Sequence, residues 1–369
     1  MAATSEQVRG DRGRGGGDMA EIVFVHGIGQ RQRGPATLGE PWRLALADGL
    51  WKAGHTDLAD RVGRSPGSPG ALGARMAYYA DLFDRPDGQG AAPVDLAGLP
   101  PAQAAAAVEL AEVWLRRAAL AAASKRDRAV ARAELADLSG AGGERQGMGN
   151  AARGALAALA RLRWFAPFGM AVAHRFVLRA LAEVVRYLGE PGMRERVQER
   201  VAAAVDDDTR VFIGHSLGSV VAFEAACRRA GPLPLLVTLG SPLGLRRIVY
   251  DRLVPQPPVY PEAVRRWVNV AADDDIVAAV PDLTGLFPRR APAAGSGPRI
   301  DAPGSDNAPG LETVAGLETV AGLETVAGLV NVAGLVNVAV DNGSAPHEAL
   351  HYLTSRQVGG PVGDALVAG

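Results

Sequence analysis

The chain has 369 residues, 48% of them hydrophobic, and its 39 basic residues nearly balance 40 acidic ones. This length and composition can bury a large core, in a single α/β domain with insertions or in two domains. The near-neutral charge, without a basic run interleaved with aromatic residues, argues against nucleic-acid binding. Cys227 is the one cysteine of the sequence, so a disulfide framework is excluded and a cytoplasmic location is expected.

The N-terminal residues 1–18 are rich in Gly, Arg and Asp and contain no apolar signal segment. We expect them to be disordered. Met19, which follows this tail directly, is a candidate for the natural translation start. An apolar strand is predicted directly afterwards, over residues 20–25. It ends in the sequence His26-Gly27-Ile28-Gly29-Gln30, a turn whose glycines expose backbone amides.

Two helical regions are predicted before the next recognisable motif. Residues 102–138 repeat apolar side chains at helical spacing, and residues 151–188 form a second region that is interrupted at Pro167. Together they predict a helical insertion over about 95–190 that packs as a cap on the core. Its most apolar part is shorter than the roughly 20 residues that span a bilayer. Several aromatic residues of the second region are candidates for lining a ligand groove: Trp164, Phe165, Phe168 and Phe176.

The most informative motif is Gly214-His215-Ser216-Leu217-Gly218, between a strand-like run at 210–213 and a helical run at 219–229. A G-x-S-x-G sequence in this setting forms a tight, strained turn, because glycines allow backbone approaches that a Cβ would block. Such a turn presents Ser216 as a nucleophile and directs the Leu217 amide to where an oxyanion would form. The Ile28 amide, after the first strand, is the second candidate oxyanion donor. An ordinary strand-to-helix turn is the competing interpretation.

A nucleophilic serine needs a histidine base and an acid that orients the base. Residues 267–272 are typical of a strand and run into Asp273-Asp274-Asp275. Asp275 is the predicted acid, because this carboxylate normally stands just before a short apolar step that turns the chain away from the strand. Asp274 is the alternative. The remaining aspartates are expected to lie in a solvated loop that caps the next helix.

A hexad repeat precedes the C-terminal region. Residues 289–309, rich in Pro, Gly, Ala and Ser, predict a flexible connection. GLETVA then occurs three times over 310–327, and GLVNVA twice over 328–339. Five hexads are too few for a free-standing β-helix at roughly 18 residues a coil. We therefore interpret them as a tandem duplication, in which the last copy forms a strand over 336–340. The flexible and repeat insertion covers about 289–335.

His347 and His351 are the two histidines that follow Ser216 and the aspartates, as the chain order Ser, Asp, His requires. His347 is the predicted base, since it follows the last strand and a loop. The segment from His347 to His351 also matches H-E-x-x-H, which on a helix would hold zinc with Glu348 as general base. Among the 18 residues after His351, Asp364 is the sole carboxylate and neither His nor Cys occurs. A third zinc ligand is therefore lacking, and no metal is expected.

These motifs together resemble the α/β-hydrolase superfamily. The resemblance is carried by VHGIG, GHSLGS, TLGSPLG, WVNVAADDDIVA and the late histidine, and covers about residues 19–30, 205–285 and 336–356. Within that superfamily the chain is similar to bacterial lipase-like or esterase-like serine hydrolases with a VHGIGQ start. The resemblance implies a mostly parallel sheet flanked by helices, with catalytic loops at the carboxyl ends of the strands. Residues 19–369 would then form one domain, with the helical cap as an insertion.

The resemblance further implies hydrolysis of a carboxylic ester through an acyl-enzyme on Ser216. His347 would be the base, Asp275 would orient it, and the Ile28 and Leu217 amides would bind the oxyanion. A small-molecule or lipid ester is the expected substrate and no cofactor is expected, while peripheral membrane contact by the cap stays open. The alternatives are a serine peptidase or thioesterase on the same residues, a zinc metalloprotease, and a non-catalytic scaffold.

Overall fold

A computed structural model describes residues 20–84, 100–140, 155, 157–159, 161–162, 170–289, 331–332 and 334–368. Several sequence predictions lie outside these residues: the tail at 1–18, the aromatic residues Trp164, Phe165 and Phe168, nearly all of the connection at 289–309, and the GLETVA hexads at 310–327.

The core of the fold is a sheet with the strand order β2-β1-β3-β4-β5-β7-β6. Six strands run parallel, and the short β6 pairs antiparallel with β7 at one edge. The strands are β1 (Ile22–Val25), β2 (Ala74–Ala77), β3 (Val211–His215), β4 (Leu233–Leu239), β5 (Val264–Ala272), β6 (Asn331–Val332) and β7 (Leu335–Val340). The strands predicted at 20–25, 267–272 and 336–340 are thereby confirmed as β1, β5 and β7, within two or three residues at their ends.

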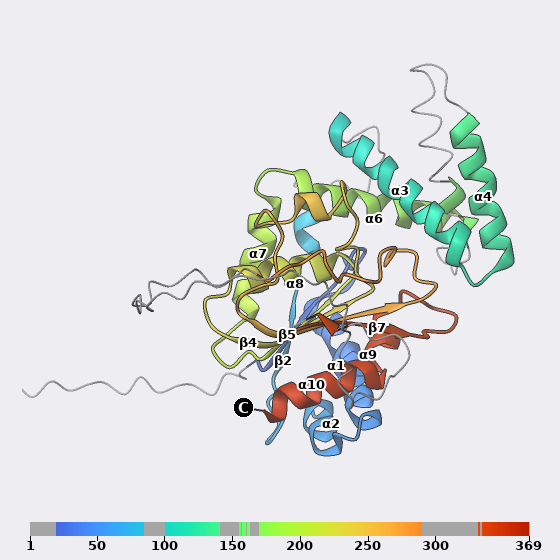
Figure 1. Cartoon of the computed structure of the whole chain (residues 1–369). Helices are drawn as coiled ribbons and strands as arrows, with labels where there is room; N and C mark the ends of the chain where they lie inside the picture. Colours follow the sequence, from blue (N-terminus) through green and yellow to red (C-terminus); the bar gives the residue numbers. More distant parts are fainter. Residues whose placement is uncertain are drawn as a thin grey trace, which may run out of the picture.

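Helices cover both faces of the sheet (Figure 1). One face carries α1 (Pro35–Lys52), α2 (Thr56–Gly63), α9 (Ala349–Leu353) and α10 (Arg356–Val367), and the other carries α6 (Met170–Gly189), α7 (Met193–Ala204) and α8 (Leu217–Arg228). Consecutive residues of β1 pack into different layers: Ile22 and Phe24 join the cluster of α1 and α10, whereas Val23 and Val25 join the cluster of α6 to α8. Burial on both faces explains why the central strands are continuous apolar runs. The predicted parallel sheet flanked by helices is confirmed.

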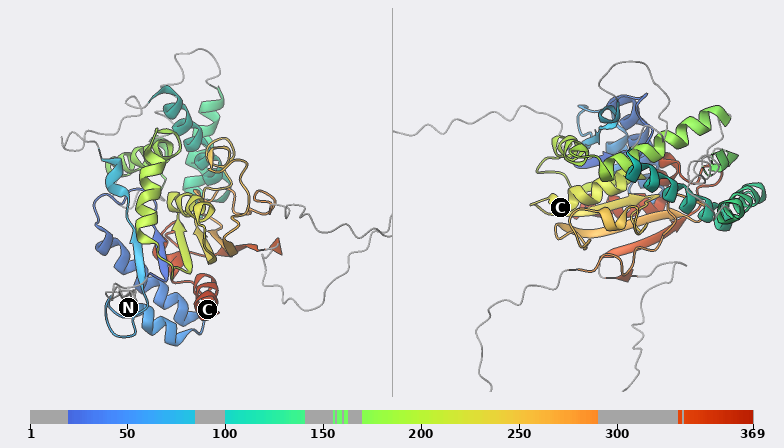
Figure 2. Two further views of the ribbon diagram at one scale, coloured as in Figure 1. Left: turned by 90° about the vertical axis from the view of Figure 1, so that its left-hand side faces the viewer. Right: turned by 90° about the horizontal axis from the view of Figure 1, so that it is seen from above.

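Two further helices, α3 (Pro101–Ala121) and α4 (Lys125–Gly140), pack against each other beside α6 (Figures 1 and 2). The Arg117 guanidinium of α3 donates a hydrogen bond of 2.7 Å to the Asp273 carbonyl, which follows β5. This contact places α3 over the carboxyl ends of the strands. Helices α3, α4 and α6 fall within the range 95–190 for which the sequence predicts helices. None of the described helices is long and apolar enough to span a bilayer.

Candidate active site

Ser216 stands at the turn between β3 and α8, with φ 56° and ψ −128°. A positive φ is costly for a residue with a side chain, and such strain persists only where the surroundings enforce it. Here they do so through two glycines. A Cβ on Gly214 would lie 2.4 Å from the Gly218 carbonyl oxygen, and a Cβ on Gly218 would lie 2.1 Å from the Val25 carbonyl oxygen. The turn is therefore as tight as its sequence motif predicts.

A cavity of about 120 Å³ lies next to Ser216 and is also lined by His347 and Ile28. Ser216 as a residue is only 3% exposed, so its side chain faces this cavity rather than open solvent. The apolar part of the remaining wall comes from α1, α3, the loop after β5 and α9: Leu38, Pro41, Trp42, Trp114, Val277, Ala349 and Leu350. Gln30, Arg33, His215 and Glu348 complete it. The cavity is thus enclosed by both the core and the α3 helix.

His347 and Asp275 form a hydrogen-bonded pair beside this cavity. His347 Nδ1 lies 2.8 Å from Asp275 Oδ2, although 72 residues separate them. Asp275 is completely buried and accepts further hydrogen bonds from the Tyr352 hydroxyl at 2.7 Å and from the Val277 amide at 2.9 Å. Asp275 can therefore orient the imidazole of His347, which also lines the cavity.

The electrostatics of Asp275 favour its ionised form. Burial alone would raise the pKa of this carboxyl, but the charge of His347 and the hydrogen bonds from His347, Tyr352 and the Val277 amide outweigh it, so the pKa lies below its usual value. Asp274, the alternative acid, is half-buried, and burial raises its pKa. His347 Nδ1 contacts Asp275 instead. The expected helix cap is not found, because residues 276–289, the described segment after the aspartates, contain no helix; Asp275 itself accepts the amides two and three residues on.

Gly240 brings the serine and the histidine–aspartate pair together. It follows β4 with φ 54°, and a Cβ there would lie 2.7 Å from Asp275 Oδ2 and 2.9 Å from His347 Nδ1. The Ser216 amide donates to the carbonyl of Leu239, the preceding residue, at 2.9 Å. The end of β4 therefore fixes the serine on one side and the pair on the other. Within the sequence this glycine stood out only as part of TLGSPLG.

Two backbone amides next to Ser216 are candidates for binding an oxyanion. No hydrogen bond from the amide of Ile28 or Leu217 is found among the described residues; Leu217 directly follows Ser216, and Ile28 lines the same cavity as Ser216. Leu217 opens helix α8, whose dipole also favours negative charge at this end. Gly27 packs directly on the serine, since a Cβ there would lie 2.8 Å from Ser216 Cβ. The Gly29 amide is already occupied, because it donates to Glu183 Oε2 at 2.8 Å.

Two buried histidines hold the backbone around the site. His215 Nε2 lies 2.8 Å from the His347 carbonyl oxygen, and burial together with the charge of His347 lowers the pKa of His215 to about 3. The ring is thus neutral and donates its Nε2 proton to that carbonyl. His26 Nε2 accepts the Tyr79 amide at 3.2 Å, so its Nδ1 donates to the Gly27 carbonyl at 2.7 Å. Sequence reasoning assigned no role to His215, Tyr79 or Tyr352.

The H-E-x-x-H segment does not have the geometry of a zinc site. Helix α9 begins only at Ala349, and Glu348 is extended with φ −77° and ψ 122°. His347 therefore precedes the helix, and His351 Nδ1 instead contacts the Asn342 carbonyl at 2.9 Å. Within the described ranges, no three His, Cys, Asp or Glu side chains gather in a way that could hold a metal ion.

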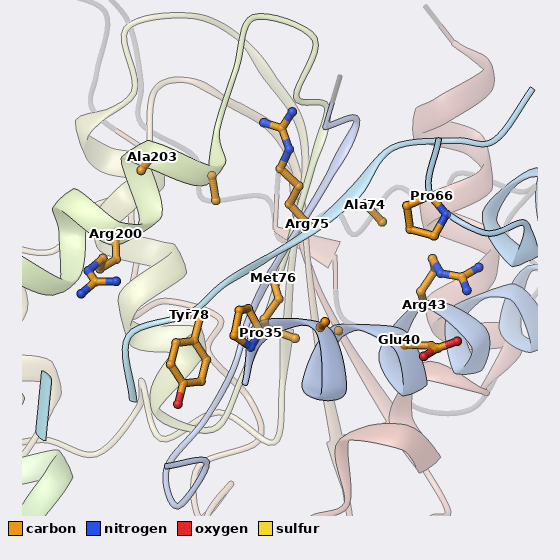
Figure 3. Close-up of a pocket in the computed structure, with 13 residues that line it drawn as sticks. Pro35, Glu40, Arg43, Pro66, Ala74, Arg75, Met76, Tyr78, Arg200 and Ala203 are labelled. Atoms are coloured by element: carbon orange, nitrogen blue, oxygen red, sulfur yellow. The ribbon is translucent and has the colours of Figure 1, made fainter. Parts of the chain in front are cut away.

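A larger cavity of about 650 Å³ lies along the free edge of β2, between α1 and α7 (Figure 3). Three arginines line it, but each already has partners. Arg43 donates to the Val62 and Arg64 carbonyls, while Arg75 and Arg200 form ion pairs with Asp206 and Asp81. None of the residues that line the cavity of Ser216 contributes to it. The arginines of this larger cavity are therefore already paired within the chain.

Comparisons with known protein families, with curated proteins and with solved structures find no match.

Proposed function

We propose that the protein is a serine hydrolase of the α/β-hydrolase fold, with Ser216 as nucleophile, His347 as base and Asp275 as the orienting acid. The observation that carries the proposal is the hydrogen bond of 2.8 Å between His347 and the fully buried Asp275, formed by a histidine that shares a cavity with a serine at a strained turn. A nucleophile, a base and an oriented acid from three distant strand ends are what this chemistry needs. The sheet order and the chain order Ser, Asp, His agree with it.

In the proposed reaction, Ser216 Oγ attacks a carbonyl carbon while His347 Nε2 takes the serine proton. The carbonyl π electrons move to the oxygen, which the Ile28 and Leu217 amides bind. Asp275 stabilises the imidazolium through Nδ1. When the tetrahedral intermediate collapses, the bond to the alkoxide breaks and His347 returns the proton to the departing oxygen. Water, deprotonated by His347, then attacks the acyl carbon; the bond from this carbon to Ser216 Oγ breaks, His347 returns the proton to Oγ, and the carboxylic acid leaves.

A carboxylic ester with a compact, apolar acyl group is the proposed substrate. Part of the wall of the 120 Å³ cavity consists of aliphatic and indole side chains, among them Leu38, Trp42 and Trp114. An apolar cavity of about 150 Å³ holds a benzene-sized molecule, so by volume a short acyl chain or a single ring would fit here. A thioester with the same acyl group would react through the same steps.

Labelling with a fluorophosphonate tests the proposal directly, because the probe phosphonylates an activated serine. We expect the purified chain to be labelled, Ser216→Ala to abolish labelling and turnover, and the exposed Ser65→Ala control to retain both. Activity that survives Ser216→Ala and is lost with a chelator would instead support zinc chemistry. Absence of labelling and of turnover in the unaltered chain would support the non-catalytic scaffold.

A series of p-nitrophenyl esters tests the substrate. We expect kcat/KM to be highest for acyl chains of about two to six carbons, since longer chains exceed the described cavity. Highest activity on palmitate would contradict the proposed acyl size without affecting the assignment of Ser216.

A further inference from the structure

Glu183 is a buried carboxylate that the proposed reaction does not use. It lies on α6, is 4% exposed, and its Oε2 accepts the Gly29 amide at 2.8 Å across 154 residues of sequence. Its other oxygen, Oε1, is buried and has no hydrogen-bond partner among the described residues. A half-satisfied buried carboxylate is costly, and such groups gather where function needs them.

The Gly29 amide belongs to the loop that supplies the Ile28 amide. Each neighbouring group of this loop is fixed by a side chain: the Tyr79 hydroxyl donates to the His26 carbonyl, His26 Nδ1 to the Gly27 carbonyl, and Gln30 Nε2 to the Ile28 carbonyl at 3.1 Å. Glu183 completes the set from the opposite side of the Ile28–Gly29 peptide. With the peptide planes before and after Ile28 both held, the direction of its amide is determined. Gly29 itself has φ 76°, which only glycine adopts without strain.

We propose that Glu183 is a positioning residue: by accepting the Gly29 amide, its carboxylate holds the Ile28 amide toward Ser216 and couples helix α6 to the hydrolytic site. This inference rests on the proposed function, because it assigns the Ile28 amide to the oxyanion. Donors in such a site act through their preorganised direction, and small misplacements lower kcat.

The protonation state of Glu183 changes the strength of this hold. Burial raises its pKa to about 7, opposed by the Gly29 hydrogen bond and by the charges of Arg31, Arg179 and Arg186. In the segment after β2, Tyr78 and Tyr79 have raised pKa values, for which burial is the first cause and the charge of Glu183 a further one. No ion pair to Glu183 forms within the described residues. An ionised carboxylate accepts a stronger hydrogen bond than a neutral acid does, so the Gly29 amide is held more firmly above pH 7.

The ratio of kcat between the unaltered chain and Glu183→Gln, measured against pH, tests the proposal. Glutamine keeps the shape and an acceptor oxygen but cannot ionise. We expect the ratio to be about tenfold near pH 8.5 and to approach one near pH 5.5, with little change in KM, because protonated glutamic acid and glutamine are then equivalent. Each kcat is normalised to fluorophosphonate-labelled sites, so a loss of folded protein does not enter.

Glu224→Gln is the matched control. Glu224 is a fully buried carboxylate with a raised pKa on α8, but its partners are the Tyr187 hydroxyl, the Val254 amide and Arg194, with which it forms an ion pair at 3.1 Å, rather than the oxyanion loop. We expect its kcat ratio to be independent of pH. A pH-independent ratio for Glu183→Gln, or the same pH-dependent ratio for both variants, would overturn the positioning role.

A second measurement needs no variant and no activity. The ¹H chemical shift of the Gly29 amide should move downfield as pH rises through about 7, because ionisation of its acceptor strengthens the hydrogen bond. A shift that does not titrate would overturn the inference even if the chain hydrolyses esters. A titrating Gly29 in a chain that fluorophosphonate does not label would instead contradict the proposed function and leave the contact with Glu183 intact.

Discussion

Removal of a single oxygen, in Tyr352→Phe, tests how much the buried environment of Asp275 stabilises the fold. The Tyr352 hydroxyl donates to Asp275 Oδ2 at 2.7 Å and accepts the Ala272 amide at 2.9 Å. A hydrogen bond to a charged group contributes about 1.5–3 kcal/mol, and a buried amide left without its acceptor costs about 1–3 kcal/mol. We expect the free energy of unfolding at pH 7 to fall by about 3 kcal/mol, measured by urea denaturation.

Tyr260→Phe provides a control that removes the same atom elsewhere. The Tyr260 hydroxyl is also part of a buried side chain, but it donates to the neutral Gly334 carbonyl at 3.0 Å. A neutral hydrogen bond contributes about 1 kcal/mol. The two variants therefore differ in the charge of the acceptor and in the Ala272 amide, which only Tyr352→Phe leaves without its acceptor.

The pH dependence of the free energy of unfolding distinguishes the hydrogen bond to the charged Asp275 from the hydrogen bond to the neutral Gly334 carbonyl. The pKa of Asp275 is held below its unfolded value, so the stabilisation from this carboxylate is complete above about pH 4 and is lost as pH falls through the folded-state pKa. The Tyr352 hydroxyl stabilises the ionised form, so the loss in Tyr352→Phe should shrink below about pH 4, while the loss in Tyr260→Phe should stay constant. Equal losses in both variants at pH 7, or a loss in Tyr352→Phe that does not change with pH, would refute this reasoning.

Three further changes test the elements around the site. Gly218→Ala should lower the free energy of unfolding by about 3 kcal/mol, and the melting temperature with it, because its Cβ would lie 2.1 Å from a carbonyl oxygen. Gly231→Ala is the control, because a Cβ there has no atom within 4 Å, and its melting temperature should not change. Equal effects of the two substitutions would contradict the packing argument. His215→Phe removes the donor to the His347 carbonyl and should lower kcat per labelled site about tenfold. An unchanged kcat would show that this hydrogen bond does not position His347. Deletion of residues 310–327 should leave kcat and the melting temperature unaltered, because none of the described site residues belongs to them. A lower kcat or a lower melting temperature would contradict this expectation.

Much of the fold could be predicted because its signals are local. The strands β1, β3 and β5 are apolar runs that end at a Gly-rich turn or an Asp cluster, and their burial on both faces follows from that composition. The edge strand β2 was missed, since its four residues Ala-Arg-Met-Ala include only one that is fully buried. The strained turn at Ser216 was predicted because its two glycines lie within two residues of the serine.

The supporting shell of the site could not be predicted, because its contacts join residues far apart in the chain. Glu183 meets Gly29 across 154 residues, and Tyr352 meets Asp275 across 77. In the sequence both look like ordinary members of amphipathic helices. The choice of Asp275 within the Asp cluster did have a local signal: the apolar step after it supplies the Val277 amide to its carboxylate.

The register of β7 shows how the fold selects one hexad from a repeat. Asn337 pairs with Asn269 of β5, and both strands read Val-Asn-Val-Ala around it. The Asn337 side chain accepts from Asn269 Nδ2 and the Leu283 amide and donates to Asp282 and Thr284. A GLETVA copy would place threonine there, whose hydroxyl has one proton to donate and cannot make both donations. The GLVNVA copy at 328–333 has the asparagine but would lengthen the path to His347 by six residues. Side-chain hydrogen bonding and the reach to the proposed base therefore both favour the last copy.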